Sequence, residues 1–161
     1  MRIKCPDVQS NMTALQVSLD HQAKLLRQSW CELNFIIEEY AREIGLSYTS
    51  LHILSLIYTS DGPCTQKIIC QQTYLPRQTV NSIITGFYKQ GWVELREMPS
   101  DRRNKSILLT TEGRRFASHV ITKMFEAEMT AMNTLEQNQR TALIETTEHY
   151  KNNFRKLIIN R

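Results

Sequence analysis

Residues 101–113 read DRRNKSILLTTEG, so charged residues, a short apolar run and a helix start follow one another directly. Arg102, Arg103 and Lys105 crowd the charged part, and Asp101 stands beside them. Charged side chains are rarely buried unless they are paired. This segment must therefore face solvent or a polyanion.

A hairpin is predicted around the charged segment. Residues 92–98 (WVELREM) alternate apolar and polar side chains, as a half-buried strand does, residues 99–100 open a turn, and residues 107–109 form the return strand. Thr110 is a good N-cap for the next helix, and Glu112 in its first turn suits the helix dipole. The sequence therefore predicts two strands with a charged tip between them, followed by a helix.

Two helices separated by a tight turn precede the hairpin. Thr65 is a good N-cap for a short helix over residues 66–72, and proline suits the first position of a helix over residues 76–90, which Gly91 ends. Another helix, over residues 48–58, comes before them. Helix, turn, helix and wing is the order of a DNA-binding unit whose second helix enters the major groove.

The helix over residues 76–90 has two different sides. Val80, Ile83, Ile84 and Phe87 define its apolar side. At about 100° per residue, the opposite side holds Gln78, Ser82, Thr85 and Lys89, flanked by Arg77 and Asn81. The helix has no acid, which suits contact with phosphates and base edges: Gln78 and Asn81 could pair with adenine, and Arg77 with guanine or phosphate. A solvated surface helix is the plainer interpretation of this face taken alone, but the neighbouring wing favours nucleic acid.

Long helices flank this unit. Apolar residues of the segment 12–44 step by four and three to form a heptad-like stripe, and Gly45 ends that helix. The stripe consists of Leu26, Trp30, Leu33, Ile37, Tyr40 and Ile44. It can pack on its own subunit, on a partner, or on both. Two more helices follow Thr110, with a break near residues 133–134, so the predicted class is mainly α with a small β-wing.

The bulk properties are compatible with a nucleic-acid partner. The net charge is +4, which permits such a partner without requiring one. No apolar run reaches the length of a membrane span and the N-terminus lacks a secretory h-region, so we expect a cytoplasmic protein with reduced cysteines. Cysteine spacings match no common zinc pattern, and no phosphate loop or nucleophile elbow occurs. We therefore expect no metal, no cofactor and no enzyme.

Residues 101–113 resemble the wing signature of the multiple antibiotic resistance regulator (MarR) family, D-R-R-x-x-x-apolar-x-L-T-x-x-G, with every fixed position present. Residues 65–67, 79–81 and 91–94 also resemble that family, so the resemblance spans about residues 46–116 by motif. Two positions depart from it: Phe87 stands where Leu is common, and Gly86 lies in mid-helix. Gly86 is expected to soften the helix by up to about 1 kcal/mol relative to Ala.

The resemblance implies a single domain with two lobes: a winged helix-turn-helix lobe at residues 46–110, embedded in a helical dimerisation lobe at residues 1–45 and 111–161. It implies a homodimer that binds a pseudo-palindromic double-stranded DNA operator, as a transcription repressor released by a small molecule or another effector. Asp101 would hold a neighbouring arginine in position. The implied DNA-binding residues are Arg77, Gln78, Thr79, Asn81, Ser82, Thr85, Lys89, Arg102, Arg103 and Lys105.

Two alternatives stay open at this point: a protein–protein interaction module that uses a winged helix, and a thiol-based redox-sensing regulator. For the second, Cys64 precedes a helix N-terminus, where a thiolate could be stabilised. A small-molecule pocket between the lobes has five candidates, although aromatic residues at helical spacing are more often core. They are Trp30, Tyr40, Tyr48, His52 and Tyr58.

Overall fold

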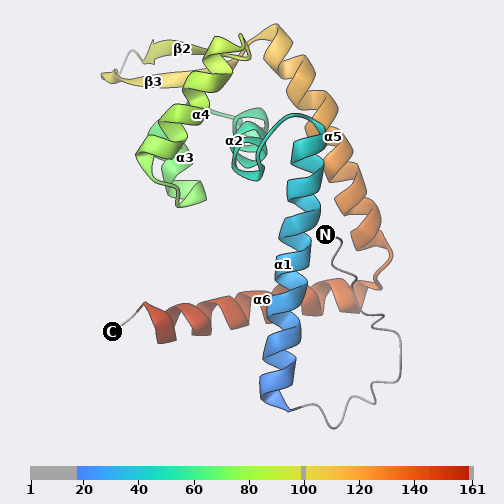
Figure 1. The fold of residues 1–161 in the computed structure, drawn as a ribbon. Helices are drawn as coiled ribbons and strands as arrows, with labels where there is room; N and C mark the ends of the chain where they lie inside the picture. Colours follow the sequence, from blue (N-terminus) through green and yellow to red (C-terminus); the bar gives the residue numbers. More distant parts are fainter. Residues whose placement is uncertain (1–17, 99–100, 160–161) are drawn as a thin grey trace, which may run out of the picture. The chain divides into compact units, whose positions relative to one another are not determined.

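The structure is a computed structural model that describes residues 18–98 and 101–159, with the side chains of residues 98 and 101–104 outside the described part (Figure 1). The chain divides into two compact units, residues 1–48 and residues 49–161. Each unit is described by itself below.

The first unit contains helix α1 (Leu19–Glu43), which the apolar stripe predicted. Gly45, with φ +76°, ends the helix. Its N–H donates to the carbonyl of Arg42 at 3.0 Å, and the N–H of Leu46 donates to that of Ala41 at 2.8 Å. These two bonds form a Schellman motif, which requires the left-handed conformation that glycine adopts without strain. The predicted helix end is thus confirmed; residues 12–17 of the expected helix lie outside the described residues.

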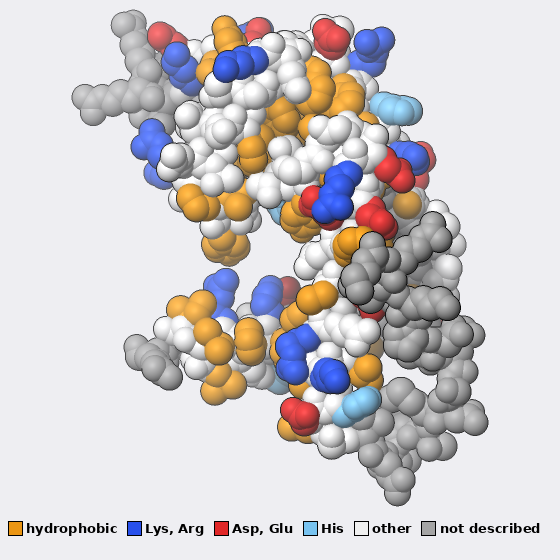
Figure 2. All heavy atoms as spheres, in the orientation of Figure 1, with side chains coloured by type: hydrophobic (Ala, Val, Ile, Leu, Met, Phe, Trp, Pro, Cys, Tyr) orange, Lys and Arg blue, Asp and Glu red, His pale blue; other side chains and the backbone are white. Residues whose placement is uncertain are grey.

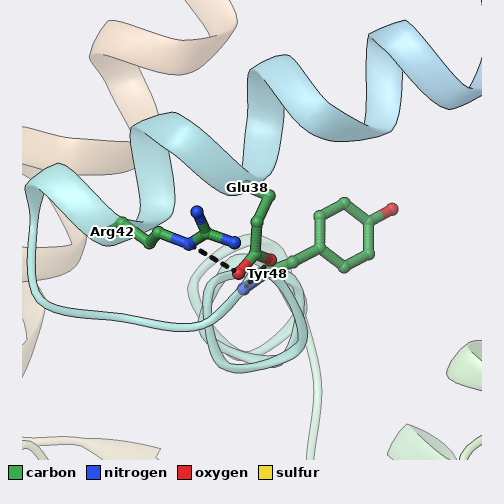
Figure 3. A network of polar contacts seen from close by, with 3 residues as sticks. All are labelled: Glu38, Arg42 and Tyr48. Carbon is green, nitrogen blue, oxygen red and sulfur yellow. Dashed lines mark hydrogen bonds and ion pairs between the residues drawn. The ribbon is translucent and has the colours of Figure 1, made fainter. Parts of the chain in front are cut away.

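Glu38 fixes the turn that leads out of α1 (Figure 3). Its Oε2 accepts a hydrogen bond from the backbone N–H of Tyr48 at 3.1 Å. Its Oε1 accepts one from Nε of Arg42, one turn further along α1, at 3.3 Å. Tyr48 is the first residue of α2 (Tyr48–Thr59), and the first amides of a helix have no partner inside that helix. One carboxylate therefore satisfies such an amide and is itself held by a cation.

The second unit holds a winged helix-turn-helix followed by two long helices (Figure 1). After α2 come β1 (Cys64–Thr65), α3 (Gln66–Thr73), α4 (Arg77–Lys89), β2 (Val93–Met98), β3 (Asp101–Leu109), α5 (Thr111–Asn133) and α6 (Gln137–Ile158). The predicted class, mainly α with a small β-wing, is confirmed.

The three strands form one antiparallel sheet in the order β1-β3-β2. Val93 pairs with Leu109 at one end of the β2–β3 ladder, and the pairing is irregular between Glu97 and Met98. The prediction that residues 101–106 form a loop tip was wrong, because β3 begins at Asp101. Apolar alternation is what marks a half-buried strand in a sequence, and residues 101–106 (DRRNKS) contain no apolar residue. The two-residue β1, which pairs with Ser106 and Ile107, is too short to produce a periodic signal.

The core of the second unit joins α2, the helix-turn-helix, the sheet and the start of α5. It is built from Leu51, Ile53, Leu54, Ile57, Ile69, Val80, Ile84, Phe87, Val93, Ile107, Ala117, Val120 and Ile121. Among residues 18–98 and 101–159, no helix is both long enough and apolar enough to span a membrane.

A tight junction joins the end of α4, the start of the wing and the start of α5. The indole of Trp92 stacks on Phe116 at 4.2 Å between ring centroids and contacts Phe87 at 5.6 Å. The Thr110 N–H donates to the carbonyl of Trp92 at 3.0 Å. A Cβ at Gly113 would lie only 1.9 Å from that carbonyl oxygen. Glycine is therefore required at position 113 by close packing of the backbone.

Candidate nucleic-acid interface

Each helix of the helix-turn-helix begins after a defined N-cap residue, although only α3 has a side-chain cap. The Thr65 hydroxyl accepts a hydrogen bond from the N–H of Ile68 at 3.3 Å, which confirms Thr65 as the N-cap of α3. Tyr74 ends α3 in the left-handed conformation, with φ +57°. Pro76 is the N-cap of α4 rather than its first residue, one position from the prediction. The turn between the helices is thus short and fixed at both ends.

The two sides of α4 lie as the sequence predicted. Val80, Ile84 and Phe87 are buried, and Ile83 is half-buried. Thr79 is also half-buried, so it is the least accessible of the proposed contact residues. The exposed positions are Arg77, Gln78, Asn81, Ser82, Thr85 and Lys89. Because Val80, Ile84 and Phe87 anchor α4 in the core, these six side chains form one polar face.

The charge around α3 and α4 has one sign. Residues 62–93 contain Lys67, Arg77 and Lys89 and no Asp or Glu. All three are exposed, and none of them forms an ion pair with a described residue. Arg96 on β2 differs, because its Nη2 lies 2.6 Å from Oε1 of Glu94. An acid-free basic surface of this kind attracts polyanions.

A hollow of about 520 Å³ lies at the surface between the helix-turn-helix and the sheet. Lys67 from α3, Arg77 from α4 and Lys105 from β3 all line it, and Leu95 and Ile107 contribute apolar surface. Lys67 belongs to the stretch 65–67 that resembles the family, but it was not among the predicted DNA-binding residues. A single lysine on a short helix gives no signal until the fold brings it beside Arg77 and Lys105.

The wing contributes Lys105 to the described surface. Lys105 is exposed and pairs across the ladder with Glu97. The backbone of residues 101–104 belongs to β3, but the side chains of Asp101, Arg102 and Arg103 lie outside the described residues. The proposed roles of these three residues therefore stay predictions.

The five pocket candidates are divided between the two units. Trp30, Tyr40 and Tyr48 belong to the first unit, and His52 and Tyr58 to the second. Hydrogen bonds with Ser118 and Thr122 lower the pKa of the Tyr58 hydroxyl, and Arg114 lies 6.0 Å from its ring centroid. Tyr58 thus already has partners on α5. The pocket stays a prediction.

The expectation that a thiolate could be stabilised at Cys64 is wrong. Cys64 lies in β1 and is 3% exposed. Burial raises the pKa of its thiol because a low-dielectric environment disfavours the thiolate. Within the described part of the chain, no group of three or more His, Cys, Asp or Glu is placed to hold a metal ion.

Comparisons with known proteins agree with this geometry. Residues 44–104 match the model of the MarR family. The HTH-type transcriptional repressor YetL of Bacillus subtilis (strain 168) is 29% identical over 84 residues, which are 52% of this chain and 50% of YetL. The chain thus aligns with about half the length of this curated relative.

Solved structures share the fold over most of the chain. A MarR family regulator from Neisseria meningitidis matches with a TM-score of 0.71 and 24% identity, covering 85% of this chain and 96% of that one. The S. aureus MepR–DNA complex matches with a TM-score of 0.69 and 18% identity, covering 83% and 97%. At these identities the structures establish the fold alone, and residues 44–104 are the segment that is similar to the MarR family.

Proposed function

We propose that this protein is a sequence-specific double-stranded DNA-binding transcription regulator that acts as a homodimer. The observation that carries the proposal is the face of α4. It is polar, contains no acid and is anchored by buried residues on its opposite side. In a winged helix-turn-helix this helix enters the major groove, where short polar side chains reach base edges. Such a regulator would act in the cytoplasm.

The basic residues around α4 would hold the phosphates. Lys67, Arg77 and Lys105 come from three different elements and border one hollow. Phosphate contacts fix the register of a protein on DNA, and base contacts specify the sequence. We assign Lys67 and Lys105 to the backbone and Gln78, Asn81, Ser82 and Thr85 to the bases. Arg102 and Arg103 would enter the minor groove.

The homodimer is supported by the apolar residues that the chain leaves uncovered. Helix α6 has no buried residue, and even its apolar residues Leu143, Ile144 and Phe154 are each about half exposed. The space-filling view shows hydrophobic side chains along this helix, at the lower left (Figure 2). Exposed apolar surface of this extent is typical of an interface. A two-fold dimer would present two copies of α4 to half-sites about one helical turn apart.

Repression is the sign of regulation that we propose, because the relative YetL is named a repressor. Release by a small molecule or another effector would follow if the ligand favoured a conformation with lower affinity for DNA. The raised pKa of Cys64 is unfavourable for the alternative in which that thiol senses oxidants.

In-vitro selection from a random duplex pool, at about 150 mM salt to suppress non-specific binding, tests this function. We expect a motif with two-fold symmetry. Recovery of no motif by a folded, dimeric protein would contradict the proposal and favour a protein-binding module.

Two variants distinguish phosphate contacts from base contacts in the proposed interface. Lys67→Ala should weaken binding to all sequences alike and reduce the dependence of log affinity on log salt by about 1, because one phosphate contact is lost. Gln78→Ala should change base preference at one position instead. Uniform weakening by Gln78→Ala would exclude base reading by Gln78.

A further inference from the structure

One hydrogen bond links α3 and α4 at the exposed face of the helix-turn-helix. Nε2 of Gln66 donates to Oδ1 of Asn81 at 3.0 Å. Gln66 is the first residue of α3 and is half-buried, whereas Asn81 is exposed on the polar face of α4. Neither amide has another hydrogen bond to a described residue. The pair therefore lies where α4 would meet the bases, and only one of its members belongs to α4.

The direction of this bond determines how Asn81 presents itself. The side-chain amide of asparagine has an oxygen that accepts hydrogen bonds and an amino group that donates them, and these two ends have nearly the same shape. In the structure Gln66 donates to Oδ1, so the oxygen of Asn81 faces α3 and its amino group is the end left to donate. An amino group recognises acceptors, which in the major groove are purine N7, guanine O6 and thymine O4.

We propose that Gln66 is a positioning residue that holds the Asn81 amide in one orientation and thereby determines which class of base edge Asn81 prefers. This inference rests on the proposed DNA-binding function. It also refines the role predicted for Asn81. The preferred edge is one that accepts a hydrogen bond, and the choice comes from a residue on the preceding helix. Gln66 itself acts through Asn81 and requires no contact with DNA.

The bond can be inverted by substitution. Gln66→Glu can only accept a hydrogen bond at neutral pH, so Asn81 must turn its amino group toward α3 and present its oxygen instead. Preference at the base contacted by Asn81 should then change from acceptor edges to the donor edges of adenine N6 or cytosine N4. We expect a change of about fivefold or more at that one base pair, the low end for a specific contact.

Gln66→Lys is the matched control. Lysine can only donate, so it keeps the oxygen of Asn81 toward α3 and should keep the original preference. The two substitutions add opposite charges, which alter affinity for all sequences. The readout is therefore the ratio of affinities for duplexes that differ at one base pair, because a uniform change of affinity cancels in that ratio.

Selection with four variants completes the test: Asn81→Ala, Gln66→Glu, Gln66→Lys, and Asn81→Ala combined with Gln66→Glu. Asn81→Ala identifies the base pair that Asn81 reads. In the Asn81→Ala background, Gln66→Glu should have no further effect on the preference there. A Gln66→Glu effect that persists without Asn81 would show that residue 66 reads the base directly, and an unchanged preference in Gln66→Glu itself would also overturn the inference.

A measurement without DNA separates this inference from the proposed function. Side-chain ¹H–¹⁵N NMR of the DNA-free protein should show the Asn81 amide protons shifted downfield in Gln66→Glu, where they become donors, and little changed in Gln66→Lys. Identical chemical shifts of the Asn81 amide protons in the two variants would overturn the proposed orientation of the Asn81 amide. If they respond as expected but wild-type protein selects no DNA motif, the proposed function fails instead.

Discussion

Helices α4 and α6 are both amphipathic, but their apolar sides differ in burial. Val80, Ile84 and Phe87 of α4 are at most 3% exposed. In α6 no residue is buried, and Phe154 and Leu157 are 51% and 79% exposed. The apolar side of α4 packs in the core of its own chain, so its polar side is the one available to bind a partner. For α6 the apolar side is the one available for interaction.

The difference indicates two kinds of interface in one small protein. A face that must read DNA needs a rigid helix behind it, and α4 obtains rigidity from intramolecular packing. A face that must bind a second copy needs apolar surface that the monomer cannot cover. In our proposal the same chain therefore uses the opposite sides of two amphipathic helices.

The largest expected effect would break this comparison at α6. Phe154→Glu places a charge on the apolar side of α6, next to Tyr150, whose ring stacks on Phe154 at 5.7 Å between centroids. An unpaired charge in a buried interface costs about 3–5 kcal/mol, so the dimer should dissociate more than a hundredfold more readily. Sedimentation velocity over a range of concentrations measures this.

Asn152→Glu is the matched control, because it adds the same charge about 200° around the helix from position 154. It should leave the dimer intact. Equal dissociation of wild type and both variants would remove α6 from the interface.

A second substitution tests the packing that positions α4. Gly113→Ala places a methyl group 1.9 Å from the Trp92 carbonyl oxygen, closer than any unstrained contact. Backbone must shift, so we expect a loss of about 1–3 kcal/mol in the free energy of unfolding, or more. Thermal and denaturant unfolding measure it. An unchanged midpoint would mean that the Trp92–Gly113 junction is not tightly packed.

Removal of the wing cations tests the polar side of the comparison. Arg102→Ala with Arg103→Ala should weaken DNA binding and lower the slope of log affinity against log salt by about 2, if each residue neutralises one phosphate. Lys24→Ala with Arg27→Ala removes two exposed cations from α1 as a control and should leave the slope unchanged. The same slope in the wing variant would exclude contact between these arginines and DNA.

Sequence reasoning succeeded wherever local chemistry decides the outcome. Gly45 and Gly91, with φ +76° and +73°, end α1 and α4 as predicted, and Thr65 and Thr110 cap α3 and α5. In each case one residue type satisfies a local backbone requirement. The buried side of α4 was predictable for a similar reason, because the helical period places it.

Features that depend on contacts between distant segments were not predictable. The outer part of β3 carries no apolar alternation, and its strand character comes from pairing with β2. Cys64 precedes a helix, but β1 buries it against β3 and raises the pKa of its thiol. Lys67 and Gln66 acquire their places only when α3 packs beside α4 and the sheet.

The smallest expected effect sharpens the comparison within α4 itself. Gly86 lies in the middle of α4, and a Cβ built there meets no atom within 4 Å. Gly86→Ala reduces the conformational entropy of the unfolded chain and introduces no clash in the folded one. It should therefore raise the free energy of unfolding by up to about 1 kcal/mol. Denaturant unfolding measures the change in the free energy of unfolding. Comparison with Gly113→Ala shows how the same added methyl group affects stability where there is space and where there is none. A destabilised Gly86→Ala protein would mean that something outside the described chain, such as a second copy, occupies that space. An increase in stability together with weaker DNA binding would instead indicate that α4 must bend at Gly86 to fit the major groove.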